Sequence, residues 1–254
     1  MIFAALGPFG DAIEFIFQER ESQAGTVRVG GLGEMWELTW THLQLSFAAV
    51  AIAVAIATPL GIWLGHIGRY QFFATSTSNI GRAVPSLGLV VFFIAFLGVG
   101  FLNVCVALVL LAIPPILTNT YVGIRGVDPE TVDAARGNGL TGRQVALQVE
   151  LPLALPTIMA GIRISLVSVI ATATIAPLAN VDTLGRPIIS PNVYGTAGQL
   201  AACIVVAILT IVADALFAVV TRAATPKGIK LAATDRGARR RFAFPSPKRS
   251  IETT

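Results

Sequence analysis

Two ionisable residues, Arg163 and Asp214, lie inside long apolar stretches of this 254-residue chain. An ionisable group in such a stretch is costly unless it faces protein or water. Either the two side chains pair between helices, or each lines a solvated pathway. The sequence contains no nucleophile elbow, zinc-protease motif or phosphate-binding glycine loop, and Cys105 and Cys203 lack metal-ligand spacing. We therefore expect no catalytic residue and no metal site.

The one sizeable polar segment between apolar stretches is 125–152, and its first half has the signals of a short helix. Asp128 is a favourable N-cap, and Pro129 suits the first helical position. The glycines Gly137 and Gly139 are then expected to end the helix and to permit a turn.

The second half of the segment has the signals of another short helix. Thr141 and Gln144 have the spacing of a capping box, in which each residue satisfies a backbone N–H near the helix start. We expect this helix to end at Pro152, because proline removes a hydrogen bond and clashes with the preceding turn. The two capped helices would form a stiff elbow.

Composition indicates what this elbow is attached to. Hydrophobic residues make up 54% of the chain and charged residues 13%, about half the share in soluble domains. No carboxylate occurs between Glu37 and Asp128. A membrane-spanning helix needs about 20 apolar residues. The sequence therefore predicts an all-α membrane protein with about five spans. They lie at about 43–65, 80–100, 103–124, 155–178 and 200–221.

The distribution of charge orients these spans. Nine lysines and arginines follow the last span, and such residues favour the cytoplasmic side. This places the basic tail 223–254, predicted to be disordered, inside the cell. Counting back puts segment 125–152 inside as well, with Arg163 and Asp214 near the cytoplasmic ends of their helices. The acidic segment 1–38 would be extracytoplasmic, with an apolar start at 1–17 that is better suited to an interfacial helix than to a sixth span.

A spacing pattern in the elbow resembles the EAA loop of permease subunits in binding-protein-dependent ABC importers. The pattern is Asp133-Ala134-Ala135, Gly139, then Leu151-Pro152, with Asp in place of the usual Glu. The resemblance implies the type I importer permease fold, with this elbow as the coupling helix that sits in a groove of a cytoplasmic ATPase. The residues to which it assigns that role are Asp133, Ala134, Ala135, Arg136, Gly137, Gly139 and Leu140. Asp128, Pro129, Thr141, Gln144, Leu151 and Pro152 would hold the elbow's shape.

Most of the chain, from about residue 40 to 227, is similar to permeases that import osmoprotectants such as glycine betaine, carnitine, choline or proline. The similarity rests on residues 82–87 (Arg-Ala-Val-Pro-Ser-Leu), 114–124 and 150–163. The chain departs from these permeases after the fourth span. There it has Asn-Val-Asp-Thr-Leu-Gly at 180–185 in place of a glycine-rich run, and a longer external loop follows.

The resemblance also implies partners. They are an ATPase subunit that binds ATP and Mg²⁺, an extracytoplasmic substrate-binding protein, and a second permease copy or a related permease, all at the plasma membrane. We expect this chain itself to bind lipid, no cofactor and no nucleic acid. The alternatives are the same fold importing another solute, such as methionine or a sulfonate, and an intramembrane enzyme. The enzyme would need clustered polar groups within the spans, where Asp214 is the one carboxylate.

Overall fold

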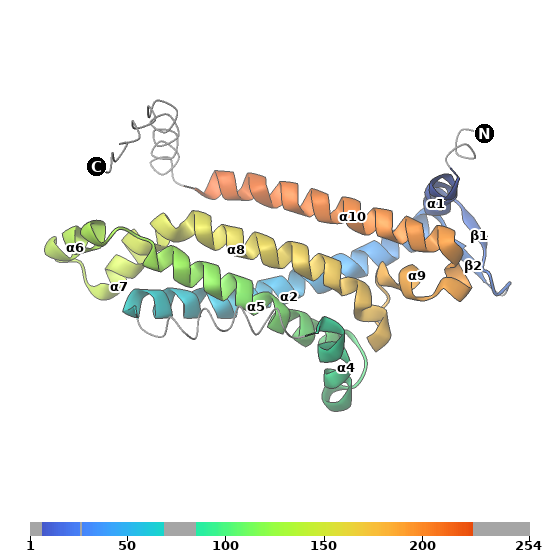
Figure 1. The fold of residues 1–254 in the computed structure, drawn as a ribbon, viewed down its shortest axis with the longest axis horizontal. Helices are drawn as coiled ribbons and strands as arrows, with labels where there is room; N and C mark the ends of the chain where they lie inside the picture. Colours follow the sequence, from blue (N-terminus) through green and yellow to red (C-terminus); the bar gives the residue numbers. More distant parts are fainter. Residues whose placement is uncertain (1–6, 26, 69–84, 226–254) are drawn as a thin grey trace, which may run out of the picture.

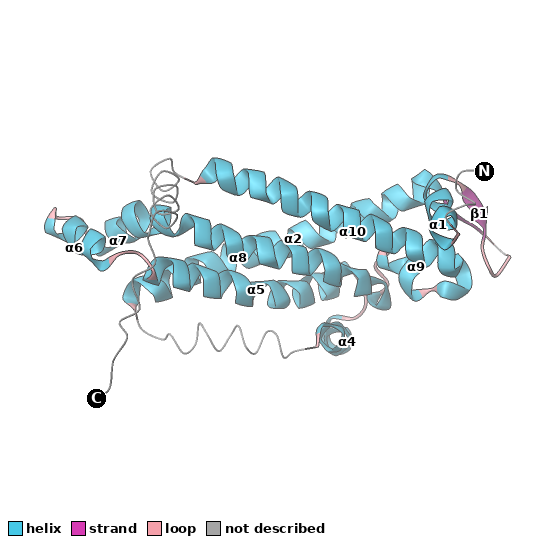
Figure 2. Ribbon diagram, turned by 45° about the horizontal axis from the view of Figure 1, so that its top comes forward, coloured by secondary structure: helices cyan, strands magenta, loops and turns pink. Residues whose placement is uncertain are grey.

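The computed structural model describes residues 7–25, 27–68 and 85–225. The tail beyond residue 225 and the start of the expected second span lie outside the described residues. Within the described part, the chain is helical apart from one small hairpin (Figure 2). Four helical segments are long and apolar enough to cross a membrane: Gly31–Ile67, Phe101–Arg125, Gly142–Ala179 and Pro191–Ala224. A fifth apolar helix, α4 (Ser86–Leu97), has 12 residues.

The first long helix, α2 (Gly31–Ile67), begins earlier than the sequence suggested, and its 37 residues make a rod of about 55 Å. The expected span began after His42 because a histidine at that point reads as a boundary. In the structure His42 is fully buried, and its Nε2 lies 2.8 Å from the carbonyl oxygen of Ile170. A buried, hydrogen-bonded histidine does not end a helix.

Three helices form the centre of the bundle: α2, α5 (Phe101–Arg125) and α8 (Leu151–Thr172). Gly61 and Gly65 lie one turn apart on α2 and face α5. A Cβ atom at either position would come within 2.7 Å of a side-chain atom of α5. Small residues at this spacing let two membrane helices approach closely. A turn separates α4 from α5, where the expected second and third spans meet, with positive φ angles at Gly98 and Gly100.

The last long helix, α10 (Pro191–Ala224), lies along α8 but is poorly covered (Figure 1). Only 6% of its most apolar 18-residue stretch is buried by the rest of the chain. It starts before the expected fifth span, after a 3₁₀ segment η3 (Ala173–Ala179) and the short helix α9 (Gly185–Ile189). One side of α10 therefore presents apolar surface away from the bundle.

Two small structures stand at opposite ends of the bundle (Figure 1). At one end are α6 (Pro129–Gly137) and α7 (Gly142–Val145), within the predicted elbow. At the other end are α1 (Pro8–Phe17) and the antiparallel strands β1 (Glu19–Glu21) and β2 (Arg28–Gly30), which pack near the start of α10. The membrane helices run between these two ends.

Candidate functional site

The first helix of the elbow forms as its capping residues indicate. The Asp128 carboxylate accepts a hydrogen bond from the Glu130 N–H at 3.0 Å, and Pro129 occupies the first turn. Helix α6 then runs to Gly137 without a single buried residue. Ala134 is exposed and Ala135 half-buried, so a partner's surface could approach the backbone of α6 closely here.

A tight turn separates the two helices of the elbow. Gly139 has a φ of +85°, a backbone conformation that favours glycine. After it, the Thr141 N–H donates to Gln144 Oε1 at 2.8 Å, and the Gln144 N–H donates to Thr141 Oγ1 at 3.4 Å. This is the expected capping box. The remaining residues assigned to the coupling role, Asp133, Arg136, Gly137 and Leu140, also lie on α6 or in this turn.

The expected end of the second helix at Pro152 is wrong. Helix α7 continues through a π-helical turn, η2 (Ala146–Glu150), directly into α8, where Pro152 occupies the first turn after Leu151. A proline at this point removes one backbone donor and crowds the preceding carbonyl, and a wider π turn relieves both conflicts. The elbow is therefore continuous with a membrane-spanning helix.

One contact between the elbow and the bundle was missed from the sequence. His66, at the end of α2, lies with Nδ1 2.7 Å from Oε2 of Glu150 in the π turn. Glu150 is only 5% exposed, and His66 Nε2 lies 3.3 Å from where a Cβ of Gly142 would be. His66 directly follows the expected first span, and Glu150 directly precedes the Leu151-Pro152 pair. The two residues are 84 positions apart, so no local sequence pattern indicated that they would pair.

The structure brings together Arg163 of α8 and Asp214 of α10. Arg163 Nε and Nη2 donate to the two carboxylate oxygens of Asp214, each at 2.5 Å, which is a bidentate ion pair. The pair lines a groove of about 590 Å³ between the two helices, together with Ser168 and Arg222. It lies deeper than expected, 12 residues from the start of α8, or about 18 Å.

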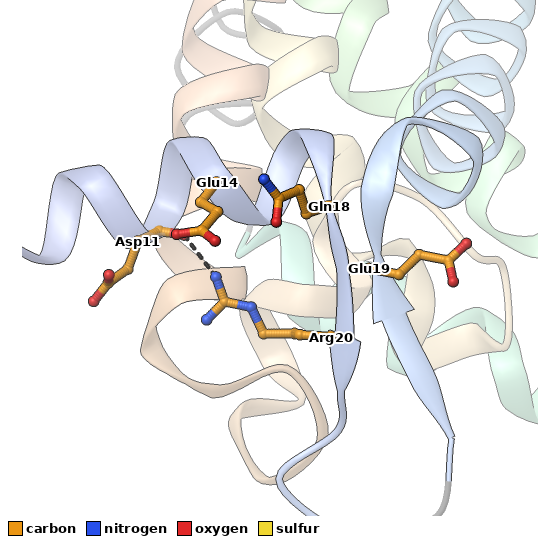
Figure 3. A pocket seen from close by; sticks show the side chains of 5 residues that line it. All are labelled: Asp11, Glu14, Gln18, Glu19 and Arg20. Atoms are coloured by element: carbon orange, nitrogen blue, oxygen red, sulfur yellow. Dashed lines mark hydrogen bonds between the residues drawn. The ribbon is translucent and has the colours of Figure 1, made fainter. Parts of the chain in front are cut away.

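The opposite end of the molecule holds a smaller polar pocket of about 260 Å³ (Figure 3). Its lining residues come from α1, from β1 and from Gln18 between them: Asp11, Glu14, Gln18, Glu19 and Arg20. The Arg20 guanidinium donates to the Asp11 carbonyl oxygen at 2.8 Å, which ties the strand to the helix. Nearby, Tyr194 is buried and donates to Glu34 Oε1 at 2.6 Å, which ties the start of α10 to the start of α2.

The described residues thus combine four apolar helical segments of spanning length with an exposed elbow at one end, as expected of an integral membrane protein that docks a partner. The family model for the "binding-protein-dependent transport system inner membrane component" matches residues 57–226, and the chain belongs to this family. It is 40% identical to the carnitine transport permease protein OpuCB of Listeria monocytogenes over 76% of this chain and 88% of that protein. It is also 39% identical to the glycine betaine/carnitine/choline permease OpuCB of Bacillus subtilis, over 78% and 92%.

The fold agrees with that of a solved transporter. An inward-facing structure of the MetNI methionine ABC transporter matches with a TM-score of 0.69, covering 77% of this chain and 98% of that one. The two sequences are 21% identical, so this likeness concerns the fold and not the solute. The chain is therefore a permease component of the inner membrane, and the two relatives described above are transport permeases.

Proposed function

We propose that this chain forms the translocation pathway for a small compatible solute: glycine betaine, carnitine, choline or proline. The observation on which this rests most is the 40% identity to a carnitine permease over most of both chains. A methionine importer is the nearest alternative, but the likeness to the methionine transporter is one of fold alone. The solute would be delivered by a separate substrate-binding protein at the outer face.

The elbow is proposed as the docking element for a cytoplasmic ATPase, on which ATP and Mg²⁺ would bind. Its exposed helix α6 and capped turn are suited to contact with a partner. Its continuity with α8 through the π turn would pass a displacement of the elbow straight into a membrane helix. A rigid body of this kind moves as a unit, so a displacement at one end also moves the other end.

The proposed orientation has segment 125–152 and the C-terminus in the cytoplasm, and α1 and the hairpin outside. Its support is the excess of lysine and arginine in the tail and of carboxylates before α2. The two ends of the bundle are then chemically distinct faces, one for the ATPase and one for the solute receptor. A second permease subunit would cover the side of α10 that this chain leaves open.

Uptake in whole cells tests the proposal. Cells lacking this chain should lose uptake of labelled glycine betaine or carnitine, and the wild-type chain should restore it. Methionine uptake, measured in the same cells, should be unchanged. Loss of methionine uptake alone would reject the osmoprotectant proposal and leave the importer family assignment in place.

A further inference from the structure

The groove between α8 and α10 has the size and composition of a small-solute site. Its volume of about 590 Å³ lies within the range of pockets that hold small ligands. Apolar side chains form much of its wall, among them Ile164, Val167 and Ala218. The charged side chains of Arg163, Asp214 and Arg222 lie among them, so the groove offers both apolar contact for methyl groups and fixed charges.

The Arg163–Asp214 pair lies well inside its two helices. Arg163 is about 18 Å along α8 from Leu151, and Asp214 is about 15 Å along α10 from Ala224, against a hydrocarbon core of about 30 Å. Their side chains are 44% and 35% exposed, so this chain alone does not bury the pair. Charged groups at that depth face protein or water and not lipid. The open side of α10 allows a second permease subunit to enclose the groove.

The groove has a net positive charge. Arg163 and Asp214 neutralise each other, whereas Arg222, one helical turn beyond Ala218, has no ion pair among the described residues. Arg222 lies two residues before the end of α10, so its positive charge stands at the mouth of the groove, where it attracts anionic groups and repels cations. It suits a carboxylate better than a lone quaternary ammonium.

We propose that the Arg163–Asp214 groove is a solute site on the translocation pathway, selective for zwitterions that bear both a carboxylate and a quaternary or secondary ammonium. The carboxylate contacts Arg163 and Arg222, the ammonium faces Asp214, and the apolar wall receives the methyl groups. This inference rests on the proposed function and narrows it. Glycine betaine, carnitine and proline fit the groove, whereas choline lacks the carboxylate.

Cysteine labelling of the permease–ATPase complex in lipid nanodiscs tests the groove without the receptor. Ser168→Cys places a thiol in the groove, and Leu216→Cys places one on an exposed part of α10 outside it. Both are made in a Cys105→Ala/Cys203→Ala background that still imports glycine betaine. Charged methanethiosulfonate reagents should modify the cysteine at 168 at least tenfold faster than the one at 216. The anionic reagent should react several-fold faster than the cationic one, and Arg222→Gln should remove that preference.

Solute protection then tests the ligand class. Glycine betaine or carnitine should slow modification at position 168 several-fold, and choline at the same concentration should not. Absence of labelling at 168, labelling without protection, or equal protection by choline would each overturn the proposal. The failure of the proposed function looks different, because wild-type cells would then take up none of these solutes whatever the labelling shows.

Discussion

The two ends of this permease are stabilised by different kinds of contact. At the elbow, Asp128, Thr141 and Gln144 satisfy backbone groups within three residues of themselves, and α6 buries nothing. At the opposite end, α1 packs on α10 through Phe15 and Tyr194, whose ring centroids are 6.3 Å apart. The elbow has a local structure that leaves its surface free for a partner. The opposite end is stabilised by contacts between residues far apart in the sequence.

The largest expected effect comes from a bulky side chain on the free surface of the elbow. Ala134→Trp should abolish copurification of the ATPase, with a loss of more than tenfold, because the indole prevents close approach to α6. Ala24→Trp is the matched control, since Ala24 is also exposed but lies in the hairpin at the other end. Both variants should reach the membrane at wild-type levels. Equal ATPase recovery with the two variants would remove the distinction between the ends.

The contact between His66 and Glu150 should matter for coupling. Glu150→Leu removes the acceptor for His66 in a nearly buried position, so solute imported per ATP hydrolysed should fall several-fold. Glu150→Gln keeps a carbonyl acceptor of the same reach and should retain most of the ratio. The measurement is paired uptake and ATPase assays on reconstituted importer. If the Leu and Gln variants behave alike, the contact has no part in transmission.

Loss of one long-range hydrogen bond should weaken the end that holds α1 and the hairpin, and not the elbow. Tyr194→Phe leaves Glu34 Oε1 without its donor, at a cost of about 1–2 kcal/mol in the free energy of unfolding. Thermal unfolding of the purified chain should register the change, while ATPase copurification stays at the wild-type level. A loss of ATPase binding in this variant would mean that the two ends are not independent.

The most local expected effect is a contrast between two glycines of the elbow. Gly139→Ala should destabilise the turn by about 1–2 kcal/mol, because its φ is positive. Gly137→Ala, at the end of α6, has free space around the added methyl and should be neutral or stabilise the helix by up to about 1 kcal/mol. Hydrogen exchange of the α6 amides would detect opposite changes in protection. Equal protection in both variants would contradict the turn geometry.

The parts of the structure that sequence predicts are those governed by nearby residues. The sequence directly predicts the roles of Asp128, Pro129 and the Thr141–Gln144 capping box, because these roles involve backbone groups only a few residues away. The pairing of Arg163 with Asp214 was one of two alternatives that the sequence left open. It was a candidate because two opposite charges in apolar helices have few other partners.

The parts that sequence does not predict depend on contacts at long range. His42 looks like a span boundary from the sequence. In the structure it is hydrogen-bonded to the carbonyl of Ile170, 128 residues away, inside the bundle. Pro152 looks like a helix end from the sequence, because a proline usually ends a regular α-helix. In the structure a π turn precedes it, and the helix continues. The α1 helix and the hairpin likewise take their positions from α10.

ATP-driven uptake by proteoliposomes containing the complete purified importer tests the central claim most directly. Labelled glycine betaine should accumulate with the wild-type chain and equally with Ala24→Trp, and should not accumulate with Ala134→Trp. Uptake by the Ala134→Trp importer at the wild-type rate would contradict the account, because α6 could then not be the surface through which the ATPase acts.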